Sequence, residues 1–206
     1  VTHNLLGLGL FNFGSEQLSY GGGVDNIGVT SGTPKVYLVF WGSQWGTQGA
    51  DSAGNLTFGN DPDSGAPYIQ KLFKGLGTNG EQWSGTMTQY CDGSAVATGA
   101  TSCPAGAAHV GYPTGGALAG VWYDNSAAAP GSATGNQIAA EAVKAAAHFA
   151  NTTAASNRYV QYDILSPHGT DPDSYQSQGF CAWHDWNGDT TLTGGAAPSS
   201  YGDIAF

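Results

Sequence analysis

The run PKVYLVFWG at residues 34–42 decides the fold of this chain, because it is the clearest strand in the sequence. An unbroken series of apolar residues follows Lys35 and ends at Gly42. Such a run indicates a strand that is buried on both faces, as in the middle of a sheet covered by helices. We therefore expect an α/β protein with this strand near its centre.

Two downstream segments have the pattern of helices that would cover such a sheet. Residues 66–76 place apolar side chains at helical spacing, and Ser64 lies just before them as a candidate N-cap. Residues 134–151 form the strongest predicted helix, since they are rich in alanine and begin with Thr134 and Gln137 at the spacing of a capping box. The expected buried stripe of this helix consists of Ile138, Ala142, Ala145 and Phe149.

Further strands are expected on both sides of the central run. Residues 118–124 and 157–165 are apolar enough for core strands, and the alternation in residues 81–91 predicts another. Residues 18–29 suggest edge strands or a hairpin, and residues 200–206 have the pattern of a strand that is beginning. The order of elements predicts a mixed sheet flanked by helices and joined by long glycine-rich loops.

Length and composition indicate one secreted, extracellular domain. The length suits a single domain over residues 1–206. Because residues 200–206 have the pattern of a strand that is beginning, we expect this domain to be the larger part of a longer or nicked protein, completed by a C-terminal segment. Only 10% of residues are charged, against about a quarter in average proteins. Val1 is interpreted as a mature N-terminus, left after a signal or pro-segment is removed.

The charge balance argues against two classes of partner. The chain has 15 acidic and 5 basic residues, a net charge of −10, so it lacks the positive charge that neutralises phosphate. Neither nucleic acid nor an anionic membrane is therefore expected as a partner. No apolar run approaches the ~20 residues that cross a bilayer. A cation such as Ca²⁺ is the partner that this surface would attract most readily.

Three cysteines leave one without an obvious partner. Cys91 and Cys103 bracket a short segment of small residues and are predicted to form a disulfide that closes a surface loop. Cys181 is then left over. In a secreted protein such a residue is a buried thiol or bonds another chain or segment. We favour a second chain or segment bonded through Cys181.

Residues that could carry proton or metal chemistry gather between residues 159 and 189. His168 and His184 follow the predicted strand that ends near residue 165, where loops commonly carry function. His184 and Asp185 are interpreted as a base with its orienting carboxylate or as a metal ligand with its neighbour, and His168 is a weaker catalytic candidate. The alternative is a surface histidine in a turn rich in tryptophan.

The spacing of Asp185, Asn187 and Asp189 predicts a calcium loop of some kind, because alternate oxygens converge on Ca²⁺ in such runs. An EF-hand is excluded, since Ala196 stands where a bidentate glutamate is needed. The alternative is a cluster of turns in which these side chains bind nearby backbone groups. The chain also has no HExxH zinc motif, no GxSxG elbow and no Walker loop.

Three segments resemble the phosphate-induced protein 1 (EXORDIUM-like) family and its secreted bacterial and fungal branch. They are PKVYLVFWG, the helix around EAVKAAAHF, and YDILSPHGTDPDSY with the following GFCAWHDW. Plant members are extracellular and associated with the cell wall, without an agreed catalytic activity. In microbial relatives, the resemblance implies a His-Glu-x-x-Glu helix after the segment that matches this chain, as in a zinc peptidase. His184 would then be a third zinc ligand, positioned by the Cys181 disulfide.

Two functions are therefore expected from the sequence. The first is a secreted hydrolase, a zinc-dependent peptidase acting on protein or peptide, with its catalytic helix beyond residue 206. The second is an extracellular protein without catalysis, which binds a cell-wall polymer or carbohydrate or has a structural role held by calcium and disulfides. For carbohydrate, the candidate stacking surfaces are Trp41, Trp45, Trp122, Trp183 and Trp186.

Overall fold

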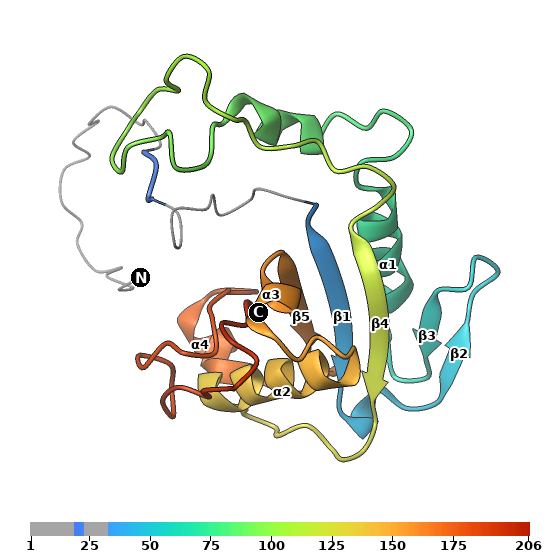
Figure 1. Ribbon diagram of the computed structural model, residues 1–206. Helices are drawn as coiled ribbons and strands as arrows, with labels where there is room; N and C mark the ends of the chain where they lie inside the picture. The colour runs from blue at the N-terminus through green and yellow to red at the C-terminus, as the bar shows by residue number, and fades with distance from the viewer. Residues whose placement is uncertain (1–18, 23–32) are drawn as a thin grey trace.

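A three-stranded parallel sheet lies at the centre of the molecule (Figure 1). In this computed structural model, which describes residues 19–22 and 33–206, the strand order is β4-β1-β5. The strands are β1 (Lys35–Trp41), β4 (Leu118–Asp124) and β5 (Val160–Leu165). The run at residues 34–42 is thus the central strand, and the predicted α/β class is confirmed.

Helices cover both faces of this sheet. Helix α1 (Gly65–Gly75) packs on one face and helix α2 (Gly135–His148) on the other. Leu38 and Phe40 of β1 belong to the apolar cluster on the α1 side, whereas Val39 packs among the alanines of α2. All three side chains are fully buried. The unbroken apolar pattern therefore reflects burial on both faces, because a strand alternates its side chains between the two.

Helix α2 begins as its sequence predicts. The Thr134 hydroxyl accepts a hydrogen bond from the Gln137 backbone N–H at 3.3 Å, and the Gln137 side chain accepts one from the Thr134 N–H at 2.9 Å. This is a complete capping box. The predicted stripe residues Ile138, Ala142 and Ala145 are buried. Phe149 is half-buried and packs on the Tyr37 ring, with 4.2 Å between the ring centroids.

Helix α1 is capped by a different residue from the one expected. Ser64 has a left-handed backbone (φ 53°), and its side chain caps no N–H of the described chain. Instead, the Asp61 carboxylate accepts hydrogen bonds from Gly65 N–H at 2.9 Å and Ala66 N–H at 2.8 Å. Ser64 occupies the predicted N-cap position, but its side chain does not cap the helix, because the Asp61 carboxylate binds the first N–H groups instead.

This capping arrangement gives a direct test by substitution. Asp61→Ala is expected to lower the free energy of unfolding by about 1 kcal/mol, since two N–H groups at the helix start lose their acceptor. Ser64→Ala is the matched control and is expected to change it by less than about 0.5 kcal/mol. Urea denaturation monitored by circular dichroism measures both. A larger loss in Ser64→Ala than in Asp61→Ala would contradict the assignment.

The strand predicted at residues 81–91 is wrong. This segment forms the 3₁₀ helix η2 (Ser84–Gln89). The Glu81 carboxylate accepts hydrogen bonds from Gly77 N–H and Ser84 N–H, both at 2.9 Å, and so fixes a tight turn at the start of η2. The apparent alternation in this segment is not a buried face, because Trp83 and Met87 are largely exposed.

Short elements connect the main helices and strands. Residues 157–165 were expected to be one strand, but β5 starts only at Val160 because helix α3 (Ala154–Asn157) precedes it. The other short elements are η1 (Ser43–Trp45), β2 (Gln48–Ala50), β3 (Leu56–Phe58), η3 (Pro172–Ser174) and α4 (Tyr175–Gln178). Strands β2 and β3 pair antiparallel. Most of the predicted hairpin at residues 18–29 lies outside the described residues.

The last residues extend the sheet beyond β5. The backbone of residues 204–206 runs parallel to β5, and Tyr162 N–H donates to the Ala205 carbonyl at 3.0 Å. On its other side, this segment pairs with Asp185 through two reciprocal backbone hydrogen bonds between Asp185 and Phe206, at 2.9 and 3.0 Å. The strand-like pattern at the C-terminus thus corresponds to short bridges. Among the described residues, no helix is long and apolar enough to cross a membrane.

Candidate functional site

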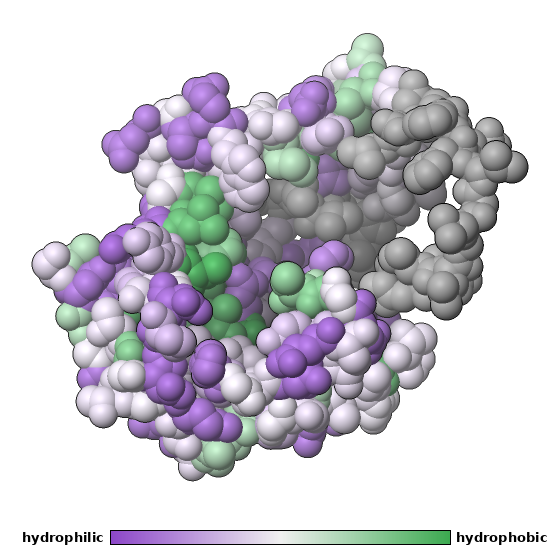
Figure 2. All heavy atoms as spheres, turned by 180° about the vertical axis from the view of Figure 1, so that it is seen from behind, coloured by the Kyte–Doolittle hydropathy of each residue, from purple (hydrophilic) through white to green (hydrophobic). Residues whose placement is uncertain are grey.

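A groove of about 930 Å³ runs along the edge of the sheet where the parallel strands begin. Its floor is formed by the first residues of β1 and β5, one wall by η2 and the segment before β4, and the other wall by the C-terminal extension. Figure 2 shows apolar side chains gathered in a hollow on this side of the molecule. We call this feature the amino-edge groove. Large apolar grooves with few polar groups are the usual form of a ligand site.

Exposed aromatic and sulfur-containing side chains line the amino-edge groove. Trp83, just before η2, is 73% exposed, and Met87 on η2 is 49% exposed. Tyr159, just before β5, is 40% exposed, and Trp186 is 43% exposed. These four are a majority of the large exposed apolar residues in the described chain. Their gathering in one groove indicates a surface that binds something, because single exposed apolar side chains are otherwise scattered.

The predicted catalytic run meets this groove at Trp186. Both Trp186 and its bridge partner Ala205 line the groove. Asp185 is directly adjacent, and its carboxylate accepts a hydrogen bond from the Trp186 N–H at 2.8 Å. His184 is exposed and lies within about 7 Å of Trp186 along the backbone. His184 and Asp185 therefore precede a groove residue in the chain, although neither is among the residues that line the groove.

His168 lies elsewhere. It follows the carboxyl end of β5 by three residues and is exposed, whereas the amino-edge groove lies at the opposite end of the same strand. The two histidines that the sequence places in one stretch thus occupy separate segments of the fold. His184 is the better candidate of the two, because it lies two residues before Trp186, which lines the groove.

The calcium-like run has a structural role in this fold. Asn187 is only 2% exposed, and its side-chain oxygen accepts from the Ile204 N–H at 2.8 Å while its amide donates to the Ala197 carbonyl at 3.0 Å. The Asp189 carboxylate accepts from the Thr191 N–H at 2.6 Å, as in an Asx-turn. These contacts favour the turn alternative for this run. A calcium ion at Asp185 and Asp189 stays a prediction.

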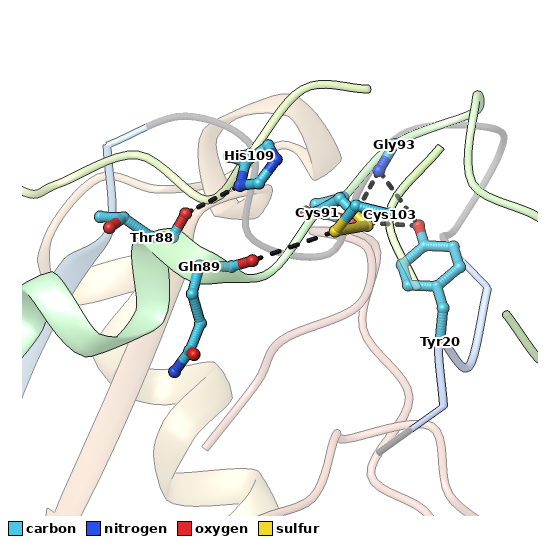
Figure 3. Close-up of a disulfide and its surroundings, with 8 residues drawn as sticks. Tyr20, Thr88, Gln89, Cys91, Gly93, Cys103 and His109 are labelled. Carbon is cyan, nitrogen blue, oxygen red and sulfur yellow. Dashed lines mark hydrogen bonds between the residues drawn. A yellow bond between two sulfur atoms is a disulfide. The ribbon is translucent and has the colours of Figure 1, made fainter. Parts of the chain in front are cut away.

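The predicted disulfide is present. Cys91 and Cys103 are bonded, with 5.6 Å between their Cα atoms. Figure 3 shows Tyr20 beside this disulfide, and the Tyr20 backbone exchanges hydrogen bonds with Gly99 and Ala100 inside the closed loop. The loop therefore anchors the first residues that the structure describes. Cys181 is exposed and has no disulfide partner within the described part of the chain.

A buried ionic cluster joins β4 to α2, and the sequence interpretation missed it. Asp124 is 3% exposed and Glu141 5% exposed. The Lys144 ammonium binds the Asp124 carboxylate, lies 3.0 Å from the Ser126 hydroxyl, and is 3.9 Å from Glu141. The helical stripe could have revealed Glu141, because it stands three residues after Ile138 and four before Ala145.

The two carboxyl groups of this cluster differ in protonation. Burial, together with the neighbouring Asp124 charge, raises the pKa of Glu141 to about 8. Burial would also raise the pKa of Asp124, but hydrogen bonds from Lys144, Ser126 and Glu141 outweigh it and hold this pKa at about 2. Near neutral pH, Glu141 is therefore mostly a neutral acid next to an ionised Asp124.

The contacts of this cluster favour a structural role, although Lys144 lies within hydrogen-bonding distance of the Ser126 hydroxyl. Lys144 is already bound to the buried Asp124 carboxylate. The two carboxyl groups are too deeply buried to contact a substrate. The cluster fastens α2 to the end of β4.

Hydrogen bonds between two loops cross the position where ligands often bind in α/β sheets. Such ligands usually bind beyond the carboxyl ends of two adjacent strands, at the point where the helices that follow them lie on opposite faces of the sheet. In this sheet the two strands are β1 and β4. At this point, the Gln44 amide donates to the Ala129 carbonyl at 2.7 Å and accepts from the Ala129 N–H at 2.8 Å. We call this pair of bonds the Gln44 clasp. It leaves the amino-edge groove as the better candidate site.

The five tryptophans proposed as stacking surfaces are mostly interior. Trp45 is buried, and Trp41, Trp122 and Trp183 are half-buried. Only Trp186 of the five is largely exposed, and the most exposed tryptophan of the described chain, Trp83, was not among them. Sequence could not separate these residues, because aromatic side chains serve equally well in cores and in binding surfaces.

Comparisons with protein-family models, with curated proteins and with solved structures find no match to this chain. Within residues 19–22 and 33–206, no group of three or more His, Cys, Asp or Glu side chains is arranged to hold a metal ion.

Proposed function

We propose that this protein is a secreted hydrolase of the peptidase class, which holds a peptide in the amino-edge groove next to His184 and Asp185. The observation that carries the proposal is that Trp186 lines this groove directly beside these two residues. An imidazole can accept or donate a proton near neutral pH, and an adjacent carboxylate can orient it. The Cys91–Cys103 disulfide supports an extracellular location.

Zinc belongs to this proposal only in part. The described residues do not make a zinc site by themselves, because they provide no cluster of three ligands. In the proposed enzyme, His184 would supply one ligand and a helix beyond residue 206 the others, as the resemblance to the EXORDIUM-like family implies. Bound zinc would polarise the peptide carbonyl and activate water. The described chain would bind and orient the peptide.

Activity is expected to depend on His184. His184→Ala should lower casein hydrolysis by the full secreted protein about a hundredfold or more, the usual contribution of one proton-transferring group. His109→Ala is the matched control, because His109 is also exposed but its ring bonds only the Thr88 carbonyl at 2.8 Å. A metal chelator should abolish hydrolysis in the control as well.

Two results would contradict this assignment. Equal activities of His184→Ala and His109→Ala would remove His184 from the site. Hydrolysis that persists in the presence of chelator would remove zinc from the proposal.

A second candidate function is extracellular binding without catalysis. The exposed side chains of Trp83 and Trp186 favour it, since exposed aromatic faces bind polymers in the absence of any catalytic group. A protein that binds a peptide or cell-wall polymer, but hydrolyses neither, would support this alternative.

A further inference from the structure

The amino-edge groove has a charge that differs from that of the whole molecule. Two of the 5 basic residues, Lys35 and Arg158, line it, but only one of the 13 acidic residues within residues 19–22 and 33–206, Asp203. The two basic residues come close together, because Lys35 N–H donates to the carbonyl of Tyr159, the neighbour of Arg158, at 2.9 Å. A chain with a net charge of −10 thus places basic side chains beside this apolar groove.

The groove lining suits a peptide better than a sugar. Aliphatic side chains contribute much of it, including Val36, Leu76 and Val160. The Asn157 side chain is already committed to the protein, because its amide donates to three backbone carbonyls and its oxygen accepts from the Tyr162 hydroxyl. Sugars need many hydrogen bonds from the walls of a site, whereas bulky apolar side chains need apolar surface.

We propose that the amino-edge groove selects acidic peptide segments with bulky apolar side chains, placing the apolar side chains between Trp83 and Trp186 and a carboxylate near Lys35. The Arg158 guanidinium also lies 6.0 Å above the Tyr159 ring, so this end of the groove combines positive charge with an aromatic face. This inference names the substrate class of the proposed peptidase. Cleavage of the bound peptide rests on the proposed function, whereas its binding does not.

The selection is tested with two labelled peptides that differ only in charge. Each contains phenylalanine and leucine, and one carries two glutamates where the other carries two glutamines. In fluorescence anisotropy with the full protein, the acidic peptide is expected to bind about fivefold more tightly at low salt. The preference should shrink as salt screens the charges. Equal affinities at low salt would overturn the proposal.

Two pairs of variants locate the peptide. Lys35→Glu is expected to remove the preference for the acidic peptide, whereas Lys71→Glu, whose lysine lies on α1 and binds Asp51, should keep it. Trp83→Ala should weaken both peptides about tenfold. Tyr68→Ala removes another exposed aromatic side chain, 68% exposed on α1, and should leave both affinities unchanged. Equal effects within either pair would contradict the location.

Other occupants of the groove give different results. If an uncharged peptide with the sequence of residues 4–13 of this chain displaces the acidic peptide and binds more tightly, the groove takes the chain's own apolar segment instead. Light scattering tests for a second copy of the chain. If it shows dimers that persist with the acidic peptide but dissociate in Trp83→Ala, the occupant of the groove is a second copy. Casein hydrolysis is measured in a separate assay. The binding assay therefore tests peptide selection, and the hydrolysis assay tests whether the protein is a peptidase.

Discussion

Asn187→Asp is expected to lower the free energy of unfolding by about 3 kcal/mol, although it changes only an amide to a carboxylate. The Asn187 amide donates to the Ala197 carbonyl from a position that is 2% exposed. An aspartate has no N–H to donate, and its charge would face that carbonyl in a buried site. The same substitution would improve a calcium ligand, so it separates the structural role of Asn187 from the calcium interpretation. Urea denaturation, with calcium and with chelator, measures the effect.

Asp189→Asn is the matched control. Its side chain accepts a hydrogen bond from the Thr191 N–H, and an asparagine oxygen can accept the same bond. The free energy of unfolding is therefore expected to change by less than about 0.5 kcal/mol. If calcium restores Asn187→Asp to wild-type stability and Asp189→Asn loses this response, the run from Asp185 to Asp189 is a calcium loop after all.

Stability is expected to fall by on the order of 3 kcal/mol between pH 5 and pH 8 because of Glu141. The folded protein raises the pKa of this residue from an ordinary 4.5 to about 8, first through burial and then through the Asp124 charge. Between these two values the folded state holds a proton that the unfolded chain releases. This contribution to stability is therefore complete below about pH 4.5 and is lost as the pH rises through 8.

Glu141→Gln should flatten this pH dependence, because glutamine fills the site without titrating. Burial also raises the pKa of Asp163 to about 6, so stability falls with pH through this residue too. This fall is the same in wild type and in Glu141→Gln, and the difference between their slopes therefore isolates Glu141. Glu81→Gln is the matched control and should leave the slope unchanged, since the pKa of Glu81 is lowered to about 2. Urea denaturation from pH 5 to pH 8 measures the slope, and equal slopes for wild type and Glu141→Gln would contradict the assignment.

The Asp124 charge limits stability at the acidic end. Its pKa is held at about 2, so its contribution is present above its ordinary 3.8 and is lost as the pH falls through 2. Taken together, the two carboxyl groups place the greatest stability of this cluster in mildly acidic solution, near pH 4 to 5.

The framework of the fold follows directly from the sequence. The apolar run from Val36 to Trp41 identifies the central strand because it is buried on both faces, and the Thr134 capping box marks the start of α2 because both of its bonds are local. Short-range chemistry of this kind can be recognised in a linear pattern. Where a tertiary contact competes, as at Ser64 and Asp61, local preference chooses the wrong residue.

Much of the candidate site depends on contacts between distant segments. Trp83, Tyr159 and Trp186 line one groove although about a hundred residues separate the first from the last. Nothing in the local pattern distinguishes them from buried aromatic residues. His184 and Asp185 could be selected by residue type, but no local pattern specifies that their segment pairs with residue 206.

The Gln44 clasp is not the only bond between the loops that follow β1 and β4. The Gly42 N–H donates to the Asp124 carbonyl at 2.8 Å, and the Ser43 N–H donates to the Ala127 carbonyl at 2.9 Å. A Cβ atom at position 42 would lie 2.6 Å from the Ala129 backbone nitrogen, so glycine is the residue that fits there. The carboxyl edge of the sheet is therefore closed by main chain as well as by one side chain, and shortening residue 44 alone would not open it.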